Sequence, residues 1–222
     1  MDACDNSDRL QFIRKVYGIL STQLLITFGS ITAVKMNDEW NEGIQQYGGL
    51  AITAAILAIA VEIPLLCCIS VARKVPTNYV LLLIFTLCET FMLTFLCAFY
   101  DSSSVLSAGG MTAGVTVALT AYALTTKTDF TMYGGAMWIM VCVMLMLSFM
   151  SMFMTFVSWW YPLVSALMVI FYGLFLIYDT QLVAGQGKYK LSMDDYIVGA
   201  LIIYIDIIGL FLELLRIFGS ND

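Results

Sequence analysis

Two apolar stretches, LFLIYDTQLV (residues 174–183) and IIYIDIIGLFLELL (residues 202–215), decide the fold of this chain. Each carries one aspartate, Asp179 and Asp206, in surroundings where water is scarce. Over all 222 residues, 61% are hydrophobic and 12% are charged, and the mean hydropathy is +0.90. Ordinary soluble domains carry about 25% charged residues. The composition therefore predicts an all-α integral membrane protein.

Seven apolar segments are long enough to be counted as membrane spans, for which about 20 residues are needed. Helices are the expected structure, because every backbone polar group must be satisfied within the segment when lipid surrounds it. The segments are 13–34, 50–72, 78–100, 105–125, 134–157, 159–178 and 196–218. We expect one transmembrane domain over residues 13–218, preceded by a short cytoplasmic segment (1–12) and followed by a tail (219–222).

The last segment is the least regular span, because it holds Asp206, Glu213 and Arg216. If it crosses the membrane, the fold is a bundle of seven transmembrane helices. If it enters the membrane and returns, the protein has six spans and a re-entrant C-terminal segment.

The distribution of basic residues predicts the orientation of the spans. When alternate loops are assigned to opposite sides, eight of the ten basic residues fall on the side of the N-terminus, and only Lys35 and Arg216 fall on the other. Cytoplasmic loops carry the excess of Lys and Arg, so the N-terminus is expected in the cytoplasm. The eight residues are Arg9, Arg14, Lys15, Arg73, Lys74, Lys127, Lys188 and Lys190.

Several classes of site are excluded by composition. The chain has no histidine, so Ser/His and Cys/His catalysis, HExxH metal sites and histidine-based pH sensing are absent. Its six cysteines lack metal-ligand spacing and are interpreted as small buried hydrophobes. Because the loops are short, we expect partners among ions, lipids and other membrane proteins, with no nucleic acid, no cofactor and no enzymatic activity.

Small residues recur every fourth position on the fourth segment, at Gly110, Gly114 and Ala118. Such a ridge predicts a close approach of neighbouring helices.

Five acidic residues lie at membrane depth, where an unpaired charge costs a few kcal/mol. They are Glu62, Glu89, Asp179, Asp206 and Glu213. Glu213 is three residues before Arg216, within reach of an ion pair. Glu62 precedes Pro64, which frees a backbone carbonyl for an ion or a water molecule. Glu62 and Glu89 are candidates for an ion pathway, or are neutral and hydrogen-bonded to Ser or Thr on neighbouring helices.

Asp179 and Asp206 are the strongest candidates for a functional pair. Two aspartates that face each other in a low-dielectric site cannot both ionise cheaply, so they share one proton, and this makes a pH switch without histidine. Deprotonated, the pair offers hard oxygen ligands that suit Ca²⁺. An arginine within reach would bind the negative pair as a latch and release it on protonation, and Arg73 is the candidate.

The motifs that carry these residues resemble the Bax inhibitor-1 family, within it the Lifeguard and Golgi anti-apoptotic protein branch. The resembling motifs are RKVYGILSTQLLIT, RKVPTN, KTDFT, LFLIYDTQLV, LSMDDYI and YIDIIGLFLELLRIFG, in this order, and the likeness runs over residues 12–219. The resemblance implies a seven-helix bundle with a central C-terminal helix.

It also implies a pH-sensitive Ca²⁺ leak from the Golgi, endoplasmic reticulum or lysosome that suppresses apoptosis. Carried over by position, Asp179 and Asp206 match the family's paired aspartates and Arg73 its latch. Partners implied are Ca²⁺, H⁺, the lipid bilayer and apoptosis-regulating membrane proteins.

Three other functions remain open. An H⁺/Ca²⁺ exchanger would use the same acids with alternating access, although no internal repeat is visible. A non-conducting protein would regulate cell death through partners. An intramembrane aspartyl protease would need GxGD around the second aspartate, whereas the chain has IYID at residues 203–206.

Overall fold

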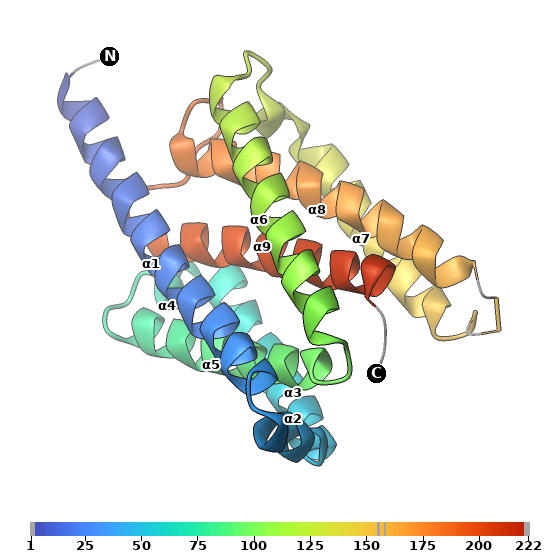
Figure 1. The fold of residues 1–222 in the computed structure, drawn as a ribbon. Coiled ribbons are helices and arrows are strands. Elements are labelled where there is room, and N and C mark those ends of the chain that lie inside the picture. The colour runs from blue at the N-terminus through green and yellow to red at the C-terminus, as the bar shows by residue number, and fades with distance from the viewer. Residues whose placement is uncertain (1–2, 155, 158, 220–222) are drawn as a thin grey trace. The chain divides into compact units, whose positions relative to one another are not determined.

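A computed structural model of the chain describes residues 3–154, 156–157 and 159–219. Every regular element in these ranges is a helix (Figure 1), which confirms the all-α prediction. The helices are α1 (Ala3–Lys35), α2 (Asp38–Gln45), α3 (Gly48–Cys67), α4 (Ile69–Ala72), α5 (Thr77–Cys97), α6 (Ser102–Thr125), the short 3₁₀ helix η1 (Phe130–Tyr133), α7 (Gly134–Ser151), α8 (Trp160–Ala184) and α9 (Tyr196–Phe218).

Seven helical segments in the described chain are long and apolar enough to cross a membrane, so the predicted number of spans is confirmed. They are Ser7–Lys35, Gly48–Cys67, Thr77–Cys97, Ser102–Thr125, Phe130–Ser151, Trp160–Ala184 and Tyr196–Phe218. A re-entrant last segment is not supported, because α9 is one unbroken helix of 23 residues. At 1.5 Å per residue it is about 35 Å long, enough to cross the hydrocarbon core.

Helix α8 continues well past the predicted end of its span at residue 178. It runs to Ala184 and stops at Gly185, whose φ of 68° and ψ of 27° lie in the left-handed region. The Gly185 N–H donates to the Gln181 carbonyl oxygen at 2.9 Å. Asp179 therefore lies inside a helix and not at its end. Hydropathy missed these residues because Asp179, Thr180 and Gln181 are polar yet buried.

The predicted spans 134–157 and 50–72 are both too long. Helix α7 ends at Ser151, and two aromatic side chains from the start of α8 donate hydrogen bonds to that residue. Trp160 Nε1 donates to Ser151 Oγ, and Tyr161 OH donates to the Ser151 carbonyl oxygen, both at 3.0 Å. The second span is interrupted at Cys68, four residues after Pro64, which separates α3 from α4.

The chain divides into two compact units, and each is described by itself. The first contains α1 to α5 with Ser192–Tyr204, which is the end of the preceding loop and the start of α9. Within it, α5 packs against both α1 and α3. The second contains Ser103–Leu191 with Ile205–Gly219, and in it α8 packs against α7 and η1. Of the seven spans, α9 has the largest buried share, 78% of its apolar window.

Candidate functional site

The second unit brings Asp179 and Asp206 together. Asp179 on α8 is 9% exposed, and Asp206 on α9 is 5% exposed. The two carboxyl groups lie close enough for a side-chain hydrogen bond between them. Because an ionised carboxylate can only accept hydrogen bonds, a bond between two carboxyl groups requires that one of them carries a proton. Their proximity and burial are compatible with one proton shared between them.

One oxygen of this pair is left over. Asp206 Oδ2 is fully buried and has no hydrogen-bond partner among the described residues. An unsatisfied buried acceptor costs about 1–3 kcal/mol. Such groups are rare in folded proteins and call for an explanation, and a bound cation or water would supply one. This oxygen is the strongest sign that the pair is a site.

A close contact between α8 and α9 adjoins the pair. Gly209 lies three residues after Asp206, on the same side of α9. A Cβ built onto Gly209 would lie 2.3 Å from Cε1 of Tyr172 on α8, so the tyrosine ring rests directly on the glycine backbone. Tyr172 is two helical turns before Asp179. The contact sets the separation of the two helices next to the aspartates.

Glu213 and Arg216 form the ion pair that their spacing predicts. Arg216 Nη1 donates to Glu213 Oε1 at 2.9 Å. The glutamate side chain is 9% exposed and the arginine side chain 57% exposed, so the pair links a buried acid to the surface of the chain. Glu213 Oε2 is another buried carboxyl oxygen without a partner among the described residues, and it lies seven residues after Asp206. It remains a candidate for an ion pathway.

Asp129 connects the loop between α6 and η1 with the loop that follows α8. It accepts hydrogen bonds from Thr131 Oγ1 (2.6 Å), Thr131 N (2.9 Å) and Lys188 N (2.8 Å). The hydrogen bond from the Thr131 hydroxyl, followed by that from the Lys188 N–H, lowers the pKa of Asp129 below its ordinary value. A Cβ at Gly187 would lie 2.3 Å from Asp129 Oδ1, so only glycine fits there.

Gln181 anchors the last turn of α8 to the same loop. Its amide Nε2 donates to the carbonyl oxygens of Ala123 (3.2 Å) and Thr128 (3.0 Å), and its Oε1 accepts from Phe130 N at 2.7 Å. Gln181 is only 2% exposed, and it lies two residues after Asp179. These bonds hold the part of α8 that carries the aspartate.

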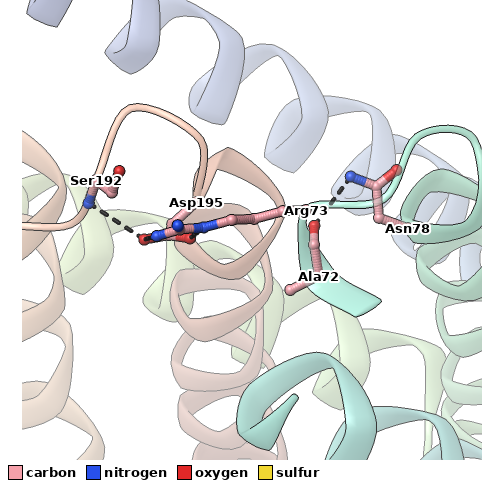
Figure 2. Close-up of polar contacts among 5 residues, drawn as sticks. All are labelled: Ala72, Arg73, Asn78, Ser192 and Asp195. Carbon is pink, nitrogen blue, oxygen red and sulfur yellow. Dashed lines mark hydrogen bonds and ion pairs between the residues drawn. The ribbon is translucent and has the colours of Figure 1, made fainter. Parts of the chain in front are cut away.

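Arg73 lies in the first unit, directly after α4, and it is bound to a carboxylate that the sequence did not single out. Figure 2 shows its guanidinium against Asp195, the residue before α9. The distances are 2.7 Å from Nε to Oδ1 and 2.9 Å from Nη2 to Oδ2. These hydrogen bonds raise the pKa of Arg73 above its ordinary value, and the charges of Asp195 and Asp194 act in the same direction. The predicted latch of Arg73 on the buried pair stays a prediction.

The two remaining predicted acids lie on neighbouring helices of the first unit. Glu62 is on α3 and Glu89 is on α5, and both are half-buried. They lie within electrostatic range of each other. Like charges in a poorly solvated region repel, so the pair would hold a proton or a cation more readily than either acid alone.

A buried network of hydroxyl groups joins α1, α5 and α9 in the first unit. Gln23 Nε2 donates to Thr86 Oγ1 at 2.9 Å. Thr27 Oγ1 lies 2.9 Å from both Thr90 Oγ1 and the Tyr204 hydroxyl, and it donates to the Gln23 carbonyl oxygen at 3.0 Å. Since Thr27 has only one proton to give, Thr90 and Tyr204 both donate to it. The network fixes α9 two residues before Asp206.

The acidic residues do not form a closed metal site. Among the described residues there is no group of three or more His, Cys, Asp or Glu side chains that could hold a metal ion. Ca²⁺ takes six to eight oxygen ligands in proteins that bind it firmly. The two aspartates supply few of these.

The sequence predicted the acidic residues but not the polar contacts that hold the neighbouring helices in place. It identified Asp179, Asp206 and Glu213 from charge inside apolar runs, but it missed the hydroxyl network and Asp195. A signal was present for the network, because Gln23 and Thr27, like Thr86 and Thr90, are four residues apart and share a helix face. Asp195 stands immediately before an apolar run, the usual place of a helix N-cap.

Comparison with known proteins agrees with this architecture. The family model described as Inhibitor of apoptosis-promoting Bax1 matches residues 9–222. The chain is 34% identical to human Protein lifeguard 3 over 98% of its own length and 71% of the relative, and 33% identical to the mouse protein over 98% and 72%. It is 32% identical to mouse Protein lifeguard 4, over 94% of the chain and 84% of that relative. The chain is a multi-pass membrane protein that belongs to the Bax inhibitor-1 family.

Proposed function

We propose that this protein is a pH-sensitive Ca²⁺ leak channel of intracellular membranes, which lowers the calcium content of a store and thereby suppresses apoptosis. Asp179 and Asp206 act as proton sensor and as transient oxygen ligands for the ion. The observation that carries the proposal is the proximity of two buried carboxyl groups, one of which has an oxygen without a hydrogen-bond partner among the described residues.

A shared proton gives the pair its dependence on pH. With one proton, the pair carries one negative charge and is held together by its own hydrogen bond. Loss of that proton places two negative charges side by side in a poorly solvated region, which drives the carboxylates apart or draws in a cation. Ca²⁺ is the cation whose charge and oxygen preference fit best. Proton and ion thus compete for one site.

The other charged residues are assigned supporting roles. Arg73 is the latch, a fixed positive charge that holds a carboxylate in the resting state. Glu62, Glu89 and Glu213 are candidates for the rest of the ion pathway. The orientation with a cytoplasmic N-terminus, and residence in the Golgi, endoplasmic reticulum or lysosome, are parts of the same proposal.

The regulation of cell death is proposed from the family description, Inhibitor of apoptosis-promoting Bax1, which names apoptosis directly. A lower calcium load in the store is a physical route to that effect. Apoptosis-regulating membrane proteins are further proposed partners.

The proposal is tested by Ca²⁺ flux through the purified protein in liposomes, measured between pH 6 and pH 8. We expect wild type to conduct at a rate that changes with pH, and Asp179→Asn and Asp206→Asn each to change that dependence. Asp194→Asn, which neutralises an exposed acid, is the matched control and should behave as wild type. An unchanged pH profile in both buried variants rules out the pair as the gate. Flux that stops when the proton gradient is collapsed indicates an H⁺/Ca²⁺ exchanger instead.

A further inference from the structure

The ion pair between Arg73 and Asp195 uses both oxygens of the carboxylate. Nε and Nη2 of Arg73 donate to Oδ1 and Oδ2 at 2.7 and 2.9 Å, the two-pronged geometry in Figure 2. Such parallel hydrogen bonds are stronger and more directional than a single contact between charges. The Arg73 side chain is 39% exposed and the Asp195 side chain is 16% exposed, so the carboxylate is the more shielded partner.

Asp195 is fixed by its own backbone as well as by the arginine. Its Oδ2 also accepts from Ser192 N at 3.2 Å, and its N–H donates to the Ser192 carbonyl oxygen at 3.0 Å. Its carbonyl oxygen accepts from Gly199 N at 2.9 Å, which is the first hydrogen bond of α9. A carboxylate at this place is favoured by the helix dipole. Asp195 therefore moves with α9 as one body.

Arg73 is fixed in the same way on the other side of the pair. Its N–H donates to the Ile69 carbonyl oxygen at 3.1 Å, which closes α4. The preceding carbonyl oxygen, of Ala72, accepts from Asn78 Nδ2 at 2.9 Å, and Asn78 is fully buried at the start of α5 (Figure 2). These two hydrogen bonds fix the turn between α4 and α5 that carries Arg73. The ion pair therefore connects this turn to the start of α9.

We propose that Asp195 is a positioning residue through which Arg73 acts, and that the latch fastens the start of α9 to the turn between α4 and α5. This inference rests on the proposed function for its effect on Ca²⁺ flux, and the pairing itself is tested separately below. In this arrangement Arg73 acts on Asp206 through α9, because Asp206 lies eleven residues, or about 16 Å, beyond Asp195 along the helix axis.

Any test must distinguish the effect of the Arg73–Asp195 pair from that of other charged and titratable groups nearby. The charge of Asp194 also acts on Arg73. On α1, Lys15 Nζ lies 3.3 Å from the ring centroid of Tyr196, the residue after Asp195. On α5, the Tyr79 ring lies 5.9 Å from the Tyr196 ring. Asp194 is exposed, so Asp194→Asn removes the same charge one residue away and leaves the two-pronged pair intact.

The pairing is tested by amide hydrogen exchange of the segment that contains the first turn of α9. Arg73→Gln and Asp195→Asn should each speed its exchange by about two- to fivefold, the range by which a partly exposed ion pair shifts an equilibrium. The double variant should exchange no faster than either single one, and Asp194→Asn should match wild type. The inference is overturned if Asp195→Asn matches the Asp194→Asn control, or if the effects of the two single variants multiply in the double variant.

The functional consequence is tested by the pH profile of Ca²⁺ flux in liposomes. If Arg73 acts through Asp195, Arg73→Gln and Asp195→Asn shift the profile in the same direction and to the same extent. Asp195→Glu, which keeps the charge, should return most of the wild-type profile. A profile that moves in Arg73→Gln but not in Asp195→Asn shows that Arg73 acts on another carboxylate. If wild type carries no Ca²⁺, the proposed function fails and the exchange result alone decides the pairing.

Discussion

Replacing Gly209 by alanine should force α8 and α9 apart beside the paired aspartates. The new Cβ would lie 2.3, 2.4 and 2.6 Å from Cε1, Cζ and Cδ1 of Tyr172. Ordinary contacts between carbon atoms begin at about 3.5 Å, so the ring must retreat by about 1 Å. Overpacking of this kind costs about 1–3 kcal/mol, and alanine returns up to about 1 kcal/mol through its higher helix propensity. A net loss of about 1–2 kcal/mol is expected.

The loss can be measured as a thermal unfolding midpoint in detergent. For a chain of this size, about 1–2 kcal/mol corresponds to a fall in Tm of about 2–8 °C. Gly114→Ala is the matched control, because Gly114 also lies in a helix of the second unit and a Cβ there would meet no described atom within 4 Å apart from the adjoining backbone of α6. Its Tm should stay level or rise. A Tm for Gly209→Ala equal to or above that of Gly114→Ala refutes the reasoning, since the ring would then not rest on the glycine.

Three further predictions concern the groups that support the site. Tyr204→Phe keeps the ring and removes the hydroxyl bond to Thr27, so it should lower the free energy of unfolding by about 0.5–1.5 kcal/mol, measured by thermal or denaturant unfolding. A change below about 0.2 kcal/mol would show that the network does not stabilise the protein. Asp129 has a lowered pKa, so its hydrogen bonds stabilise the folded state above the ordinary carboxyl pKa, and this contribution is lost as the pH falls through the lowered folded value. Asp129→Asn should therefore lower Tm at pH 7 and bring no further loss well below about pH 4, and an equal loss at both pH values contradicts this. Gly187→Ala should disturb the same loops, seen as faster amide exchange around residue 129, because its Cβ would overlap Asp129 and Thr131.

Most of the fold could be predicted from the sequence, because hydropathy reports the one property that a membrane span requires. The number of spans and the helical character of the last segment follow from length and composition. The ends of α7 and α8 could not be predicted in this way. Ser151 stops α7 where two aromatic side chains bind it. Helix α8 continues because the buried Gln181 is satisfied by hydrogen bonds that hydropathy does not see.

Helix contacts were harder to predict than helix positions. The ridge of small residues at Gly110 and Gly114 predicted a close approach, but both glycines are exposed, and a Cβ on either would meet no described atom within 4 Å apart from the adjoining backbone of α6. Within the described part of the second unit, this prediction was wrong at both glycines. The close approach occurs at Gly209 instead, because spacing alone does not tell which face of a helix meets a bulky neighbour such as Tyr172.

The residues of the candidate site could be predicted from the sequence, but their partners could not. The aspartates could be found because a charged residue in lipid is costly and conspicuous. The partner of Arg73 could not, because its carboxylate lies 122 positions along the chain, in a loop where acidic residues are ordinary. Which of several acids an arginine binds is decided by the turn that presents it, and that turn is held by Asn78.

The central claim is that Asp179 and Asp206 hold one proton between them, and infrared spectroscopy of the purified protein tests it most directly. The C=O stretch of a protonated carboxyl group is distinct from the bands of an ionised one, so it can be followed from pH 6 to pH 8 in wild type, Asp179→Asn and Asp206→Asn. The account predicts one buried carboxyl band that changes over this range in wild type and is lost or displaced in each variant. A spectrum that neither substitution alters would contradict it.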